Sequence, residues 1–522
     1  MIAAPMPADT ASPTTDASTF KSLDPATGEV VASFAVHTED EVKDTVRRAQ
    51  VAAQYWAGLG ERARRSRLAA WRSQLVERTD ELAALIHVEN GKPLDDAVVE
   101  VSIAIAHLDW ATQHARKILG RRRVLPGVLA PNHAATVEYL PFGVVGVIGP
   151  WNYPVHTPMG SISYALAAGN AVVFKPSEFT SAVGTWLVDS FAEVVPEQPV
   201  FQVVTGFGAT GAALCTAGVD KLAFTGSART GKRVMAACAE TLTPCVIEGG
   251  GKDAMIVAAD ADVELAAAQA VWGAMFNGGQ TCAGVERVYV EAPIYEDFLA
   301  RVRLHAAKLT VGESADSDYG AITMPGQVDI IAAHIDDALA RGGRALVGGR
   351  ESVRAPFIEP VVLVDVPRDS VAVTEETFGP TMVIDRVADL DEAVEQANSG
   401  AYGLGASVFS RHRGDDIAGR LKAGMVSINS VLTYASVPGL PWGGSGNSGF
   451  GRIHGADGLR EFARSRAVTR QRFAIPLKLA TFGRSDKAID QLKHIARLRW
   501  GRSVTRVGVD RPRAERDVTR TP

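Results

Sequence analysis

The sequence predicts an α/β fold built from more than one domain. Between about residues 135 and 251, short β-branched runs alternate with helical segments about five times, which is typical of a parallel sheet covered by helices on both faces. A second series of strands and helices begins at about residue 249. The length of 522 residues exceeds what one hydrophobic core supports and favours two or three domains.

The elements follow in order along the chain. Residues 1–19 are rich in Pro, Ser, Thr and Ala and lack the basic and apolar regions of a signal peptide, so we expect a disordered tail. Residues 38–119 have helical apolar spacing, with a Thr-x-x-Glu cap at Thr38 and a stop at Gly91. Residues 121–139 predict a two-stranded arm with a Pro/Asn turn.

Composition excludes several classes of protein. The net charge of −5 argues against a nucleic-acid partner. Four cysteines without metal-ligand spacing argue against a disulfide framework and a zinc site, and they fit a cytoplasmic location. No apolar run reaches the length of a transmembrane helix. Residues 484–522 form a basic tail, with eleven Lys/Arg against five Asp/Glu.

Three residue types suited to catalysis follow strands or stand among small residues. Cys282 of FNGGQTCAG is a thiol that a substrate can approach, although most lone cysteines are buried apolar residues. Glu248 of IEGGGK suits a general base, or alternatively a loop cap. Asn152 of PWNYP suits an amide donor to an oxyanion, or alternatively a turn.

Other strand ends suit a dinucleotide, because ligands of parallel sheets bind beyond the carboxyl ends of the strands. GFGATG, with Gly208 at its centre, has the GxGxxG form but lacks the companion acid downstream. Gly226 and Ser227 of FTGS lie where a helix N-terminus can hold a pyrophosphate, although Ser227 also suits a plain N-cap. Lys175 and Glu178 of KPSE could hold a ribose, and the carboxylate would favour NAD over NADP; the alternative is an exposed ion pair.

From about Phe20 to Arg470 the chain resembles the aldehyde dehydrogenase superfamily, of the hydrolytic, non-acylating type. The motifs FNGGQTC, IEGGGK, PWNYP, KPSE, FTGS, EETFGP, NSGAYGL and PWGGSGNSGFGR match in the family's order. The resemblance implies that Cys282 is the nucleophile, Glu248 the general base and Asn152 the oxyanion donor. It implies NAD(P) as cofactor, with no metal site, and cofactor contacts at Trp151, Lys175, Glu178, Gly208, Gly226, Ser227, Glu376 and Phe378.

The resemblance also implies the domain layout. We expect an aldehyde-dehydrogenase-like fold: a Rossmann-type NAD-binding domain at 20–120 and 140–248, and an α/β catalytic domain at 249–440. A small β oligomerisation arm at 121–139 and 466–480 predicts a homodimer or homotetramer, followed by a basic C-terminal extension at 481–522.

Two positions depart from the family pattern. Gly249 replaces the usual leucine after the glutamate, so we expect a more flexible tip that places Glu248 less firmly. Gly160 replaces a bulky tunnel residue, so we expect a wide substrate tunnel.

The sequence therefore predicts the NAD(P)-dependent oxidation of an aldehyde to an acid through a cysteine hemithioacetal and thioester. The expected tunnel is mostly apolar and favours a hydrophobic aliphatic or aromatic aldehyde; its expected residues are Tyr153, Thr157, Gly160, Trp272, Met275 and the 430–442 loop. Two alternatives are a CoA-acylating enzyme, which Glu248 argues against, and a catalytically silent binding protein on the same fold. Residues 486–500 predict a basic amphipathic helix that packs on protein, covers the tunnel or contacts an anionic membrane.

Overall fold

The computed structural model describes residues 18–314, 316–475 and 481–501. Of the predicted N-terminal tail at 1–19 and the predicted C-terminal extension at 481–522, residues 1–17 and 502–522 lie outside these ranges. The chain forms two compact units, one of residues 1–121 with 138–466 and one of residues 122–137 with 467–522. The predicted α/β class is confirmed, whereas the finer domain limits remain a prediction.

A six-stranded sheet forms the first half of the larger unit. Its strand order is β21-β9-β8-β5-β6-β7, and all neighbours are parallel except β21 and β9. The chain runs outward from β5 to β7 and then returns to the other side of β5 with β8, so the carboxyl ends of β5 and β8 flank a switch point where α/β proteins bind ligands. The strands are β5 (Val144–Ile148), β6 (Ala171–Lys175), β7 (Phe201–Val203), β8 (Lys221–Thr225), β9 (Cys245–Glu248) and β21 (Gly449–Phe450).

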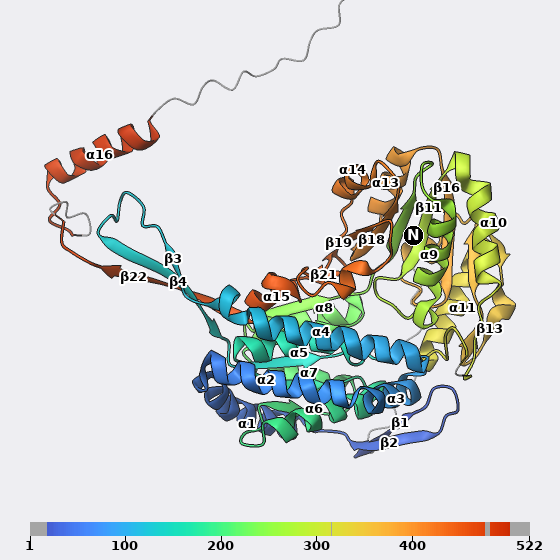
Figure 1. The fold of residues 1–522 in the computed structure, drawn as a ribbon, viewed down its shortest axis with the longest axis horizontal. Helices are drawn as coiled ribbons and strands as arrows, with labels where there is room; N and C mark the ends of the chain where they lie inside the picture. The colour runs from blue at the N-terminus through green and yellow to red at the C-terminus, as the bar shows by residue number, and fades with distance from the viewer. Residues whose placement is uncertain (1–17, 315, 476–480, 502–522) are drawn as a thin grey trace, which may run out of the picture. The chain divides into compact units, whose positions relative to one another are not determined.

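Helices cover both faces of this sheet, and Figure 1 shows α4 running beside α2 and α5. The predicted capping box is confirmed: Thr38 accepts from the backbone of Glu41, whose carboxylate accepts from Thr38. The predicted stop at Gly91 is also confirmed, because Gly91 adopts φ +87° after α3. The helices are α1 (Glu39–Gly58), α2 (Gly60–Glu77), α3 (Thr79–Asn90), α4 (Leu94–Leu119), α5 (His156–Ala168), α6 (Ser181–Val194), α7 (Gly208–Thr216), α8 (Ala228–Glu240) and α15 (Gly455–Glu461).

A seven-stranded sheet of order β12-β15-β16-β11-β10-β18-β19 forms the second half of the same unit. Only β12 runs antiparallel to its neighbour. Its strands are β10 (Asp253–Val257), β11 (Val285–Glu291), β12 (Arg344–Val347), β15 (Val361–Val364), β16 (Thr381–Val387), β18 (Gly405–Phe409) and β19 (Met425–Ile428). The accompanying helices are α9 (Val263–Met275), α10 (Tyr295–Ala306), α11 (Pro325–Ala340), α12 (Val371–Thr374), α13 (Leu390–Asn398) and α14 (Gly414–Arg420).

Shorter pairs complete the list of strands. A three-stranded sheet has the order β22-β4-β3, with β3 (Arg122–Val124), β4 (His133–Pro141) and β22 (Ala463–Gln471). Helix α16 (Asp486–Trp500) has the bounds that its apolar spacing predicts. The remaining pairs are β1 (Thr19–Leu23) with β2 (Val30–Ala35), β13 (Val353–Arg354) with β14 (Phe357–Ile358), and β17 (Tyr402–Gly403) with β20 (Ser445–Gly446).

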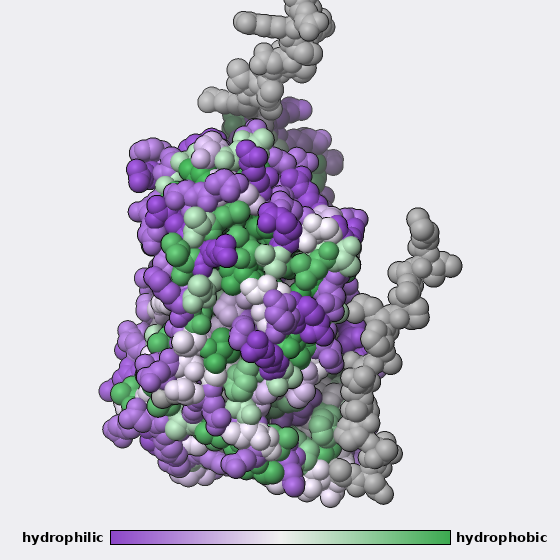
Figure 2. Space-filling model, turned by 90° about the vertical axis from the view of Figure 1, so that its right-hand side faces the viewer, coloured by the Kyte–Doolittle hydropathy of each residue, from purple (hydrophilic) through white to green (hydrophobic). Residues whose placement is uncertain are grey.

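The central strands are buried throughout, since every residue of β5, β6, β10 and β18 is shielded from solvent. On the face drawn in Figure 2, apolar residues form islands among polar ones. Among the described residues, no helix is both long enough and apolar enough to cross a membrane.

A buried ion pair fixes the segment that joins β5 to α5. Lys92 and Glu100 lie 2.5 Å apart, and both side chains are 1% exposed. The second oxygen of Glu100 accepts from the backbone N–H groups of Val155 (2.8 Å) and His156 (3.0 Å), at the free N-terminus of α5. The Lys92 ammonium also donates to the carbonyl of Asn152 at 2.9 Å. The pair therefore holds the PWNYP segment against α4.

We expect Glu100→Gln to destabilise the protein by about 3–5 kcal/mol, because it leaves the Lys92 ammonium buried without a counter-charge. The measurement is the urea or thermal midpoint of unfolding. Glu39→Gln is the matched control, since Glu39 pairs with Lys43 on the surface and its loss should leave the midpoint unchanged. Equal midpoints for the two variants would contradict this account.

Candidate active site

The thiol of Cys282 follows a tight turn between α9 and β11. Asn277, Gly278 and Gly279 adopt left-handed conformations in succession, with φ of +55°, +64° and +70°. A Cβ atom on Gly279 would lie 1.9 Å from the carbonyl oxygen of Gly379, so only glycine allows the two loops to touch. The glycines therefore bring the thiol loop against the loop that contains the EETFGP motif.

The amide of Asn152 reaches the same turn. Asn152 is 4% exposed, and its Nδ2 donates to the carbonyl of Gln280 at 2.9 Å, two residues before Cys282. An amide group has two N–H donors, so one remains for a further acceptor. Its own backbone carbonyl accepts from Lys92 and from Asn277 Nδ2. The side chain is thus tied to the thiol loop and the backbone carbonyl is held by two further donors, so Asn152 is more than a turn-forming asparagine.

The carboxylate of Glu248 ends strand β9 and is 4% exposed. Thr225 Oγ1 donates to its Oε2 at 3.2 Å, and Trp442 Nε1 donates to its Oε1. Burial raises the pKa of Glu248 to about 7, and the two hydrogen bonds oppose that rise. A carboxyl group that titrates near neutral pH suits proton transfer.

Burial also raises the pKa of the Cys282 thiol well above its usual range, and the charges of Glu248, Glu376 and Asp253 add to the rise. A negative charge on Glu248 therefore opposes formation of a thiolate at Cys282. The thiolate is the nucleophile, so the raised pKa of the thiol must be offset before Cys282 can attack.

The predicted ribose-binding pair lies beyond β6. Lys175 and Glu178 are 3.5 Å apart, with side chains 6% and 31% exposed. Burial lowers the pKa of Lys175, and the nearby Glu178 partly restores it. The pair is therefore not the exposed ion pair of the alternative interpretation: the ammonium is buried and the carboxylate half-buried.

The predicted pyrophosphate site lies between β8 and α8. Ser227 caps α8, since its Oγ accepts from the backbone N–H of Thr230 at 3.3 Å. A Cβ on Gly226 would lie 2.8 Å from the ring of Phe224, whereas a Cβ on Gly208 would meet nothing within 4 Å. The cap accounts for Ser227, and the helix N-terminus beside it still suits an anion.

Glu376, Phe378 and Trp151 lie on facing loops. Glu376 Oε1 accepts from the backbone N–H of Gly251 at 3.0 Å, and burial raises the pKa of Glu376 to about 8. The rings of Trp151 and Phe378 meet edge to face at 5.4 Å. A half-buried carboxyl group and an aromatic face thus adjoin the loop that follows Glu248.

A second buried ion pair, which the sequence analysis missed, anchors the Glu376 loop. Lys252 pairs with Glu286, and its ammonium also donates to Thr377 Oγ1 at 3.1 Å. Glu286 accepts from the backbone N–H groups of Thr377 and Phe378 at 2.9 and 3.0 Å. Lys252 is the last residue of the IEGGGK motif, but no local pattern identifies Glu286 as its partner.

The structure corrects the expectation of a wide tunnel at Gly160. A Cβ there would lie 2.4 Å from Nε2 of His454, so the missing side chain makes room for an imidazole rather than for substrate. His454 lies beyond the family motif that ends at Arg452, which is why the sequence did not predict it.

The structure also corrects the expectation of a loosely held Glu248. A Cβ on Gly249 would lie 2.4 Å from the carbonyl of Asn447, and the Gly249 N–H donates to the carbonyl of Ser448 at 3.0 Å. Glycine is thus required by the approach of β21, and the side chain of Glu248 is bound at both oxygens.

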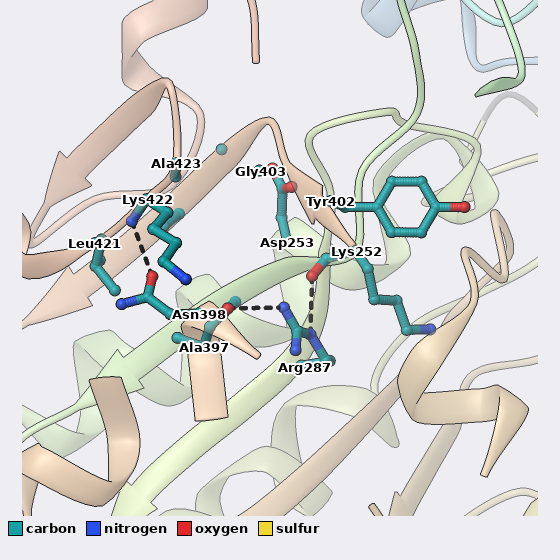
Figure 3. Close-up of a pocket in the computed structure, with 13 residues that line it drawn as sticks. Lys252, Asp253, Arg287, Ala397, Asn398, Tyr402, Gly403, Leu421, Lys422 and Ala423 are labelled. Atoms are coloured by element: carbon teal, nitrogen blue, oxygen red, sulfur yellow. Dashed lines mark hydrogen bonds between the residues drawn. The ribbon is translucent and has the colours of Figure 1, made fainter. Parts of the chain in front are cut away.

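A pocket lined by several polar side chains lies at the start of β10 (Figure 3). Asp253, Arg287 and Lys422 line it, and the Arg287 guanidinium donates to backbone carbonyls of Lys252 and Ala397. No predicted catalytic or cofactor residue lines it, although Lys252 and Asp253 also border the site described above.

The strand ends fit a dinucleotide. Beyond the carboxyl ends of β7, β8 and β6, which belong to one parallel sheet, lie the open space over Gly208, the N-terminus of α8 and the Lys175–Glu178 pair. These elements offer backbone N–H donors for phosphate and a carboxylate acceptor for ribose hydroxyls, as such a cofactor needs.

Known proteins resemble this chain over most of its length. A sequence model described as the Aldehyde dehydrogenase family matches residues 12–468. The chain is 38% identical over 449 residues to a 4,4'-diapolycopene aldehyde oxidase of Methylomonas sp., covering 85% of this chain and 84% of that protein.

Two solved structures have the same fold. One is a betaine aldehyde dehydrogenase of Staphylococcus aureus in complex with NAD+, 28% identical, covering 89% of this chain and 96% of that one with a TM-score of 0.84. The other is an NADP-dependent glyceraldehyde-3-phosphate dehydrogenase of Bacillus halodurans complexed with NADP, 32% identical, covering 87% and 96% with a TM-score of 0.83. The family model matches most of the chain, and a relative covered over 84% of its length is 38% identical. The chain therefore belongs to the aldehyde dehydrogenase family and has its fold.

Proposed function

We propose that the protein oxidises a hydrophobic aldehyde to a carboxylic acid, with Cys282 as nucleophile and Glu248 as general base. The observation that supports this most directly is the meeting of three groups at adjoining loops: a thiol, a buried carboxyl group with a pKa near 7 and an asparagine amide. Each matches one need of aldehyde oxidation through a thioester.

In this proposal, Cys282 Sγ attacks the aldehyde carbon, and the free N–H of Asn152 stabilises the oxygen of the hemithioacetal. One such donor is typically worth about 2.7–4 kcal/mol in the transition state. A bound nicotinamide supplies the hydride acceptor. Glu248 then takes a proton from the water that hydrolyses the thioester on Cys282.

The substrate class is supported by the aromatic surroundings of the thiol loop. Trp272 stacks on Phe276 at 4.9 Å, and Tyr153 lies 6.2 Å from Phe276. A relative at 38% identity is a 4,4'-diapolycopene aldehyde oxidase, whereas relatives at 34–35% identity are named succinate-semialdehyde dehydrogenases. The aromatic side chains and the relative with the higher identity support an apolar substrate.

The two alternative activities have less support. A CoA-acylating enzyme has no use for a base at Glu248, and here that carboxyl group is buried and hydrogen-bonded with a pKa near 7. A silent binding protein has no need for a thiol, an amide and a carboxyl group at adjoining loops. All four cysteines are free thiols, which supports the cytoplasmic location that we include in the proposal.

We expect Glu248→Gln to release one stoichiometric burst of NADH and then stall, with steady turnover about 10²- to 10⁴-fold below wild type, because only hydrolysis of the thioester needs the base. Wild-type turnover should rise with pH through about 7, as Glu248 loses its proton. Stopped-flow absorbance at 340 nm and product analysis with and without CoA are the measurements.

The matched control is Cys282→Ser, which should bind NAD normally and lose both burst and turnover, at least about 1000-fold. Undiminished turnover in Glu248→Gln would reject this residue as the base, and an acyl-CoA product would support the acylating alternative.

We also propose that Glu178 makes the enzyme prefer NAD. Its half-buried carboxylate would repel a 2′-phosphate placed on the adenosine ribose. Glu178→Gln should narrow the ratio of kcat/KM for NAD over NADP by about tenfold. Glu193→Gln, which removes an exposed carboxylate on α6, should leave the ratio unchanged. A wild-type enzyme that prefers NADP would refute this assignment.

For the smaller unit we propose self-association through the arm and contact of α16 with an anionic membrane. Apolar side chains of the arm are exposed, with Leu125 at 93% and Leu129 at 52%. Helix α16 exposes Lys493, Arg497 and Arg499 together with Trp500 at 60%. An apolar aldehyde delivered from a bilayer would suit such a helix.

We expect the full chain to be a dimer or tetramer by light scattering and to bind vesicles containing phosphatidylserine. Each cation near the surface is worth about 1 kcal/mol, so charge-neutral substitutions of Lys493, Arg497 and Arg499, or truncation after Ile475, should abolish vesicle binding. The truncated enzyme should also lose activity toward long alkanals presented in vesicles while keeping activity toward short ones. A monomer contradicts the role of the arm. Unchanged vesicle binding contradicts the role of the helix.

A further inference from the structure

The indole of Trp442 contacts Glu248, and the proposed mechanism gives this contact no role. Its Nε1 donates to Oε1 of Glu248, while Thr225 Oγ1 donates to Oε2. An indole N–H is a donor only, so it stabilises the ionised carboxylate more than the protonated acid. The base is thus held in one orientation by two neutral donors.

The position of Trp442 does not depend on Glu248. Its backbone forms both hydrogen bonds of an antiparallel bridge with Ile453, at 2.7 and 2.9 Å. Its ring, 7% exposed, meets Tyr434 edge to face at 5.7 Å and His156 at 6.4 Å, and lies 6.0 Å from His454. The indole is therefore fixed by packing, and its N–H is aimed before Glu248 ionises.

A cluster of buried imidazoles supports this packing. The rings of His107 and His454 lie 3.8 Å apart, and those of His107 and His156 5.4 Å. His107 Nε2 contacts the carbonyl of Ala435 at 3.0 Å, which ties α4 to the segment that leads to Trp442. Tyr164 on α5 donates to the carbonyl of Pro438 at 3.1 Å, in the same segment. The cluster thus anchors the 435–442 segment to two helices.

The titratable groups around this contact have defined states. Burial lowers the pKa of His156 to about 3 and the pKa of His454 well below its usual range, so both imidazoles are neutral at physiological pH. Burial raises the pKa of the Cys282 thiol, and the charge of Glu248 adds to the rise. The hydrogen bonds from Trp442 and Thr225 are the interactions that favour the ionised form of Glu248 against burial.

We propose that Trp442 is a positioning residue for the general base, whose indole N–H holds the Glu248 carboxylate ionised and oriented for thioester hydrolysis. The inference rests on the proposed role of Glu248. Hydride transfer does not require this contact, so its loss should affect only deacylation, and most strongly below neutral pH.

The test is Trp442→Phe, which keeps an aromatic ring and removes the N–H. We expect a normal NADH burst. The acidic limb of the pH dependence of the steady-state rate should move to a pH about one unit higher, so that the deacylation rate at pH values below this limb is about tenfold lower than in wild type. At high pH the rate should approach that of wild type. Thr225→Val, measured at saturating cofactor, should move the limb in the same direction by a smaller amount.

Trp186→Phe is the matched control, because the indole of Trp186 donates to Glu81 at 2.7 Å on helices outside the site. Trp186→Phe should leave the acidic limb of the pH–rate profile unchanged. If Trp442 had a purely structural role, Trp442→Phe would raise KM for the aldehyde and lower the unfolding midpoint, but the acidic limb of its pH–rate profile would coincide with that of wild type. That result would overturn the inference.

A measurement on the otherwise unchanged chain covers the case in which Trp442→Phe does not fold. With 5-fluorotryptophan incorporated, one ¹⁹F resonance should titrate with a midpoint near 7 and lose this titration in Glu248→Gln. No titrating resonance would overturn the inference. If Glu248→Gln itself turns over undiminished, the proposed function fails instead, so the two failures are distinguishable.

Discussion

Three backbone segments cross so closely at the site that side chains do not fit between them, and the chemistry depends on this crossing. A Cβ on Gly250 would lie 2.1 Å from the carboxylate of Glu376, and a Cβ on Gly251 would lie 2.5 Å from the carbonyl of Cys282. Gly279 meets the carbonyl of Gly379 in the same way. Glycine has no Cβ, so these loops can bring the thiol of Cys282 and the carboxyl groups of Glu248 and Glu376 close to one another.

Loops that contain so much glycine need anchors, and two buried ion pairs provide them. Lys92 with Glu100 holds the segment of Asn152 against α4, and Lys252 with Glu286 holds the backbone of Thr377 and Phe378. In both pairs the glutamate also accepts backbone N–H groups, so its desolvation is compensated by hydrogen bonds as well as by charge. Rigid anchors behind flexible backbone keep reacting groups in place.

The sequence was sufficient for the parts that depend on local pattern. Strand and helix alternation predicted the parallel sheet, Thr38 and Gly91 predicted helix ends, and the motif residues fall at strand ends and on adjoining loops. What could not be predicted depends on contacts between distant segments. Nothing in the sequence around Gly160 predicted that the imidazole of His454, a residue distant along the chain, occupies the space beside Gly160. Trp442 was predicted as part of an apolar loop and of the PWGGSGNSGFGR motif but not as a partner of Glu248, because that hydrogen bond spans 194 residues.

The pKa directions at Cys282 and Glu248 also constrain the order of chemical events. Burial disfavours both negative charges, and a charge on Glu248 raises the pKa of the thiol further, so a thiolate is easiest to form while Glu248 holds its proton. In the proposed mechanism, attack by the thiolate therefore favours a neutral Glu248. The thioester that follows has no charge on sulfur, so burial is what then opposes ionisation of the carboxyl group, and the hydrogen bonds from Trp442 and Thr225 favour it. With a pKa near 7, the same carboxyl group can be neutral when the thiolate attacks and charged when water must be activated.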